Sequence, residues 1–122
     1  MANDFKRYTK TNVTTSTGTS ADAVYTVPSA GGTAMETVVI GIYLSNTGTT
    51  GVTGSVFLDA GTGTGDDIYV VKDATVPAGS TLEVISGGKL VVQGNGTAND
   101  IIKISSSTAS SLDATVSVLE EV

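Results

Sequence analysis

The sequence predicts an all-β fold, an antiparallel β-sandwich of jelly-roll type with an extended N-terminal arm. The first indication is a period of two, because short runs of Val, Ile and Leu alternate with Thr, Ser and Gly along most of the chain. The second is that apolar residues nowhere recur at the 3.6-residue spacing of a helix for long enough to form one. The third is that clusters of Gly, Pro, Asn and Ser separate the runs, as tight reversals of the chain require.

Nine segments have the composition and spacing expected of strands in a compact all-β domain. They are residues 4–14, 23–27, 36–46, 51–60, 67–74, 80–86, 89–93, 100–105 and 113–120. Turn-forming residues lie in most of the breaks, for example at 28–32 and 46–51. Short strands in this number favour a two-sheet jelly roll over a closed barrel. A β-solenoid is the competing architecture, but the chain shows no repeat of fixed period to support it.

Two of these segments also indicate how their strands are covered. Residues 37–45, TVVIGIYLS, form a nearly continuous apolar run, which is typical of a central strand covered on both faces or buried by assembly. Apolar and polar residues alternate in residues 52–59, which predicts a sheet with one solvated side. Val52, Gly54, Val56 and Leu58 share one face of that strand, and Thr53, Ser55, Phe57 and Asp59 share the other.

The chain is 122 residues long, which is the length of one domain. We expect residues 1–14 to form an N-terminal arm or an edge strand, and residues 15–122 to form a single sandwich domain. With two Phe, four Tyr, and neither Trp nor Cys, the core must consist of Val, Ile, Leu and Ala without disulfides. A thin core with exposed sheet edges favours controlled association of copies of the chain.

Charge is distributed unevenly along the chain. Residues 1–10 carry Lys6, Arg7 and Lys10 against Asp4, whereas the rest of the chain holds three basic and eleven acidic groups. The N-terminal segment is therefore either a solvated strand or a basic arm that docks on an acidic neighbour. The acidic body disfavours nucleic-acid binding. No run of 18 apolar residues and no signal-peptide core is present, so we expect no membrane span and synthesis in the cytoplasm.

The residue types leave little scope for catalysis, and we expect neither an enzyme nor a cofactor nor a metal site. The chain has no His and no Cys, which removes the commonest general base, the thiol nucleophile and the usual zinc ligands. Asp59, Asp66 and Asp67 lie close in sequence, but they flank a glycine-rich loop without the aromatic platform of a glycosidase. Gly63, Gly65 and Asp67 match part of a calcium-binding repeat once, so ion binding remains an alternative to a mobile hairpin loop.

Several segments follow one another in an order that is informative as a whole. They are YTVP at 25–28, VVIGIYLSNT at 38–47, YVVKD at 69–73, VPAGSTL at 76–82, KLVV at 89–92, DIIKISS at 100–106 and SVLE at 117–120. In this order, and within so short a chain, they resemble the small jelly-roll-like virion structural proteins of tailed bacteriophages, cyanophages among them. The resemblance covers most of the chain and depends on the order, because each segment alone is common in β-sandwiches.

This resemblance implies a capsid decoration or cement protein that binds the outer surface of the assembled phage head. The implied location is the capsid surface of the virion, and the implied partners are the major capsid protein and further copies of the chain in a homotrimer. We expect the partner-binding residues to be Phe5, Lys6, Arg7 and Tyr8, which reach the capsid or an adjacent decoration subunit. A tail or fibre component is the alternative. A free carbohydrate-binding module is disfavoured, because it needs an exposed aromatic platform.

Overall fold

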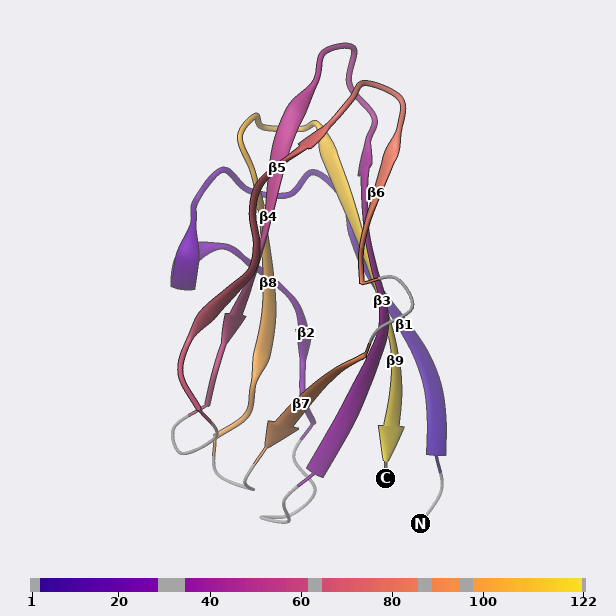
Figure 1. Ribbon diagram of the computed structural model, residues 1–122, viewed down its shortest axis with the longest axis vertical. Coiled ribbons are helices and arrows are strands. Elements are labelled where there is room, and N and C mark those ends of the chain that lie inside the picture. Colours follow the sequence, from indigo (N-terminus) through magenta and orange to yellow (C-terminus); the bar gives the residue numbers. More distant parts are fainter. Residues whose placement is uncertain (1–2, 29–34, 62–64, 86–88, 95–97, 122) are drawn as a thin grey trace.

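The computed structural model describes residues 3–28, 35–61, 65–85, 89–94 and 98–121, and these form nine strands and one short 3-10 helix, Gly18–Ser20 (Figure 1). The strands are β1 (Asn3–Lys10), β2 (Asp22–Thr26), β3 (Met35–Asn46), β4 (Val52–Asp59), β5 (Ile68–Val76), β6 (Thr81–Ile85), β7 (Leu90–Gly94), β8 (Ile101–Ser106) and β9 (Leu112–Glu121). All nine predicted strands are confirmed, with boundaries that differ by a few residues. The first strand ends at Lys10 and not at residue 14, because the chain turns at Asn12, whose φ is 53°.

The strands form two antiparallel sheets that pack as two layers (Figure 1). The five-stranded sheet has the order β1-β9-β3-β6, with β7 also paired to β3, and the four-stranded sheet has the order β2-β8-β4-β5. The pairs β1–β9, β2–β8, β3–β6/β7 and β4–β5 are nested, as in one long hairpin whose two arms have been rolled up together. This is the jelly-roll arrangement, and it confirms the predicted fold class.

The N-terminal segment is an edge strand and does not lie outside the sheet. β1 pairs with β9 along its whole length, from Asn3 opposite Glu121 to Lys10 opposite Ala114. The ring of Tyr8 also packs against the ring of Tyr25 on β2, with the centroids 4.9 Å apart. Of the two alternatives for residues 1–14, the structure therefore has the edge strand, because these contacts hold β1 on the sandwich.

The core lies between the two sheets and is mostly aliphatic, as the composition predicts, but buried Tyr25 and Met35 also belong to it. Gly54 lets the layers approach closely, because a Cβ there would lie 2.7 Å from Cδ1 of Leu44 and 2.9 Å from Cδ1 of Leu112. The predicted inward face of residues 52–59 is confirmed, since Val52 and Val56 are buried and Leu58 packs on the core. Side chains without any exposed surface include Val39, Ile42, Leu44, Val56, Ile102, Ile104, Leu112, Val116 and Val118.

Strand β3 runs through the middle of the five-stranded sheet, with β9 on one side and β6 and β7 on the other. Its inward side chains, among them Val39 and Leu44, are buried against the four-stranded sheet. Its outward side chains include Val38, which is half-buried, and Ile40, which is 39% exposed. Within the described residues no element covers this outward side (Figure 1). Among the described residues, the apolar run at 37–45 is thus covered on one face only.

Candidate functional site

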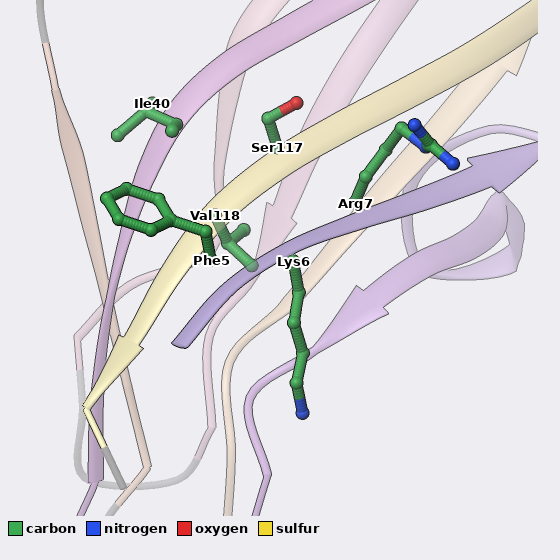
Figure 2. Close-up of a pocket in the computed structure, with 6 residues that line it drawn as sticks. All are labelled: Phe5, Lys6, Arg7, Ile40, Ser117 and Val118. Carbon is green, nitrogen blue, oxygen red and sulfur yellow. The ribbon is translucent and has the colours of Figure 1, made fainter. Parts of the chain in front are cut away.

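The four residues predicted to bind a partner lie on β1, and they divide between the two faces of the sheet. Phe5 and Arg7 point outward, and Phe5 is 76% exposed. Lys6 and Tyr8 lie on the inward side of the same sheet, and both contact Glu120 of the neighbouring strand β9. Figure 2 shows the ring of Phe5 beside Ile40 of β3, while Lys6 extends to the other side of the sheet. The period of two along a strand explains this division.

On the inward side, Glu120 of β9 is the centre of a polar cluster at the edge of the core. Only 1% of its side chain is exposed, and the Lys6 ammonium lies 3.0 Å from Oε1. The hydroxyl of Tyr25 donates to Oε2 at 2.7 Å, and that of Tyr8 donates to the same oxygen at 3.2 Å. The Tyr25 hydroxyl is also 2.9 Å from Oγ1 of Thr37. These contacts tie β1, β2, β3 and β9 together.

The cluster changes the ionisation of its members in a consistent direction. Burial raises the pKa of Glu120, but the hydrogen bonds from Tyr25 and Tyr8 and the contact with Lys6 outweigh burial, so the pKa lies below its ordinary value. Burial and the nearby Glu120 carboxylate raise the pKa values of Tyr25 and Tyr8. The contact with Glu120 likewise raises the pKa of Lys6. Glu120 is therefore held ionised and the tyrosines neutral, which suits a structural clamp on β1.

On the outward side, apolar residues of four neighbouring strands form one continuous row. Phe5 of β1 lies opposite Leu119 of β9, Leu119 lies opposite Val38 of β3, and Val38 lies opposite Val91 of β7. We call these four residues the apolar row. Phe5 is 76% exposed and Val91 is 51% exposed, and Leu119 and Val38 between them are half-buried. Four strands held in register thus present an apolar surface to the solvent on a rigid support.

A shallow depression lies next to the apolar row, where Ile40 stands out from an irregularity of β3 (Figure 2). The pairing of β3 with β9 shifts between Val39 and Gly41, so Ile40 is an extra residue in that stretch of the strand. The irregularity directs its side chain outward beside Phe5. The residues that line the depression are Phe5, Lys6, Arg7, Ile40, Ser117 and Val118.

Charged residues flank the apolar row on the same face. Arg7 follows Phe5 by two residues on β1, and Glu36 precedes Val38 by two residues on β3. Both β1 and β3 run antiparallel to β9, so they run parallel to each other. Arg7 therefore lies on one side of the row and Glu36 on the other. Neither Arg7 nor Glu36 has an ion-pair partner within 4.0 Å among the described residues. The face therefore combines exposed apolar area with Arg7 and Glu36 beside the row, and with exposed Glu83 of β6, opposite Tyr43, farther along the sheet.

Sequence reasoning identified Phe5 and Arg7 but missed Val38, Leu119 and Val91. These residues come from three segments that are distant in sequence, and their alignment depends on strand register, which the sequence does not reveal. The signal that could have found Val38 is the apolar run at 37–45, whose unbroken character already required cover on a second face.

The acidic residues of the glycine-rich loop serve the fold in this structure. Asp59 pairs with Lys103 of β8 at 2.7 Å, and Oδ1 of Asp67 accepts a hydrogen bond from the backbone N–H of Ala60 at 2.7 Å. Gly63, which belongs to the partial calcium-binding repeat, lies outside the described residues. Among the residues that the structure describes, no cluster of three acidic side chains suited to a metal ion occurs.

The outer face of the four-stranded sheet carries the one aromatic pair found there among the described residues, Phe57 of β4 and Tyr69 of β5. Their ring centroids are 5.0 Å apart at an angle of 68°, and both side chains are half-buried. The Lys72 ammonium lies 5.3 Å from the centroid of the Tyr69 ring, a cation–π arrangement. The rings therefore pack on each other and beneath Lys72, and they do not form an open platform for a sugar.

Comparisons with known proteins identify no relative of this chain. No protein-family model, no curated protein and no solved structure matches the chain. In the described part of the chain, no helix has the length and apolar character needed to cross a membrane.

Proposed function

We propose that this protein is a virion structural protein of a tailed bacteriophage, a capsid decoration or cement protein on the outer surface of the assembled head. The observation that carries the proposal is the apolar row, with Phe5 at 76% exposure on a sheet whose strands are held in register. Contiguous exposed apolar residues on a protein surface often mark a site of contact with another protein, and an adhesive protein needs such a site. The resemblance in segment order to small virion proteins supports the same role.

A protein of this kind stabilises a shell by mass action alone. A molecule that binds the assembled shell better than the free capsid subunits lowers the free energy of the shell by its binding energy. No reaction is required, which suits a chain without His or Cys. Major capsid protein would be the principal partner. A homotrimer would let one small subunit repeat a modest contact three times, so that avidity replaces contact area.

Copy number distinguishes decoration from the alternative, a tail or fibre component. Quantitative mass spectrometry of purified particles should find the chain in numbers comparable to the major capsid protein if it decorates the head. A few copies per particle would favour the tail or fibre role, and absence from particles would refute both. Removal of the protein from the heads should also lower the temperature at which they release DNA.

The role of the exposed residues is best tested by a point variant. Deletion of β1 would leave Glu120 without Lys6 and Tyr8 and would disturb the fold itself. Phe5→Ser removes only an exposed ring, and it should lower the occupancy of particles. Ile68→Ser is a matched control, since Ile68 is also apolar and 49% exposed but lies on the four-stranded sheet. Undiminished occupancy with Phe5→Ser would remove this face from the mechanism.

A further inference from the structure

We propose that the outer face of the five-stranded sheet is the contact surface between copies of this chain. The inference rests on the proposed function and deepens it, because it names a neighbouring copy of the chain, and not the capsid protein, as the partner that covers the apolar row. The occupant is a second copy, and the argument rests on the apolar character of β3, on the cross-strand row and on the placement of two charges.

The apolar run of β3 has side chains on both faces of the strand, and the described residues cover only one of these faces. The four-stranded sheet buries Val39, Ile42 and Leu44 completely. The other face leaves Val38 half-buried and Ile40 39% exposed, with no described element over them. Contiguous exposed apolar residues on a sheet face mark a protein contact site, so a second protein surface is the layer that would cover them.

The apolar row has a shape that favours a flat, sheet-like occupant. Its four residues lie side by side across β1, β9, β3 and β7, so the surface extends across the strands and is not a deep pocket. The depression beside Phe5 and Ile40 is shallow and open to the solvent. A flat apolar face is the usual complement of another flat face, and sheets pack face to face in this way.

The charges on this face are those that a second copy would need. Arg7 and Glu36 lie on opposite sides of the apolar row and have no ion-pair partner among the described residues. A second copy laid across the face brings its own Glu36 to Arg7 while the two apolar rows overlap. Two such ion pairs form in each contact, because the same face of both copies takes part, and a contact of this kind closes a twofold dimer. The apolar overlap supplies the affinity, and the charges set the orientation.

The first test is the mass of the purified full chain by sedimentation velocity over a wide range of concentration. The wild-type protein should form an oligomer reversibly, and Phe5→Ser and Val91→Ser should each raise the dissociation constant at least about tenfold. Ile68→Ser should leave it unchanged. Circular dichroism checks that every variant is folded. Two exposed positions are substituted so that the test can still be made if one of the two variants does not fold. A wild-type chain that stays monomeric throughout, or variants that associate like the wild type, would overturn the inference.

The second test exchanges the charges of Arg7 and Glu36. Arg7→Glu alone and Glu36→Arg alone should each weaken association, because each places like charges together. The double variant Arg7→Glu/Glu36→Arg should recover most of the wild-type association, because opposite charges meet again. A double variant that is no better than the single ones would contradict the proposed pairing of Arg7 with Glu36.

These measurements use no phage particle, so their outcome is independent of the proposed function. A chain that associates through this face but is absent from virions would refute decoration and uphold the inference. A chain that occupies particles in many copies, yet is monomeric in solution and unaffected by Phe5→Ser, would do the reverse.

Discussion

The outer faces of the two sheets differ in whether their outward side chains have partners among the described residues. On the four-stranded sheet, polar and aromatic groups satisfy one another, since Lys103 pairs with Asp59 at 2.7 Å and Phe57 packs on Tyr69. On the five-stranded sheet, the apolar row is exposed, and Arg7 and Glu36 face the solvent without an ion-pair partner among the described residues. These side chains of the four-stranded sheet therefore contact one another, whereas those of the five-stranded sheet leave apolar area and charge exposed.

This difference indicates that the five-stranded side of the sandwich is better suited to contact a partner than the four-stranded side. Both sheets share the same aliphatic core, so the core says nothing about partners. The contrast also predicts how substitutions should divide: changes inside the sandwich alter stability, changes on the four-stranded face alter it slightly, and changes on the five-stranded face alter association.

The largest effect is expected in the layer that both sheets share. Ile102 of β8 has no exposed surface, so Ile102→Ala should lower the free energy of unfolding by about 2–5 kcal/mol through lost burial and an unfilled cavity. Urea denaturation followed by circular dichroism measures it. Ile68→Ala, at a 49% exposed position, should change the same quantity by less than about 0.5 kcal/mol. Equal losses at the two positions would mean that the layers are assigned wrongly.

The clamp on β1 should give the next largest effect. Glu120→Ala removes the acceptor of two tyrosine hydroxyls and should cost about 2–3 kcal/mol of unfolding free energy. Glu83 is exposed on β6 and serves as the control, so Glu83→Ala should change stability by less than about 0.5 kcal/mol. Chemical denaturation of both variants compares them directly, and similar losses would refute the structural role of Glu120.

The pH dependence of stability should follow the same cluster. The folded pKa of Glu120 lies below its ordinary value, so its contribution is present above the unfolded pKa of about 4.3 and is lost as pH falls through the folded pKa. The raised pKa values of Tyr25 and Tyr8 act at the other limit, and their contribution is lost as pH rises above about 10. Thermal unfolding across pH should show both declines. Glu120→Gln should flatten the acid decline, and an unchanged profile would exclude Glu120 as its source.

The ion pair on the four-stranded sheet should matter less. Lys103 and Asp59 are partly buried, with 13% and 23% of their side chains exposed, so Lys103→Met should cost at most about 1 kcal/mol. Its stability measured at high and low salt should differ less than that of the wild type, because the screened pair is gone. A loss well above this value would indicate that the outer face of this sheet contributes as much as the clamp on β1.

The smallest change in stability is expected on the five-stranded face. Val91 is 51% exposed, so Val91→Ser should alter the unfolding free energy of the monomer by less than about 0.5 kcal/mol. The same variant should have a large effect on association, and this separation is the signature of a contact surface. A variant that loses stability in the monomer would place Val91 in the core and weaken the comparison.

The strands could be predicted from the sequence, but the residues that meet on the outer face of the five-stranded sheet could be predicted only in part. Alternation of apolar and polar residues is local, so the inward face of residues 52–59 could be recognised from the sequence alone. For residues 1–14 the sequence left open an arm or an edge strand, and the structure has the edge strand, because pairing with β9 holds β1 on the sheet. That outcome depends on the last strand of the chain, more than 100 residues away, and no local pattern in residues 1–14 reports it.

The buried carboxylates show the same limit. Glu120 and Asp100 look like solvent-exposed acids in the sequence, yet both are buried, and Asp100 accepts hydrogen bonds from the backbone N–H groups of Gly61 and Gln93 at 2.9 Å. Their partners come from distant strands and loops. The resemblance to virion proteins could suggest a role for the chain, but it could not reveal that Lys6 and Tyr8 face inward while Phe5 and Arg7 face outward.

The cover proposed for the five-stranded face can be tested most directly by cysteine labelling, with an exposed position on the other sheet as the control. The chain has no native Cys, so Val91→Cys and Ile68→Cys each give a single thiol, one on each sheet. Their rates of reaction with a maleimide are measured at low and at high protein concentration. If copies cover the five-stranded face, the rate at position 91 falls on association and the rate at position 68 stays the same. Equal rates at position 91 at both concentrations, with the oligomer present, would contradict the account.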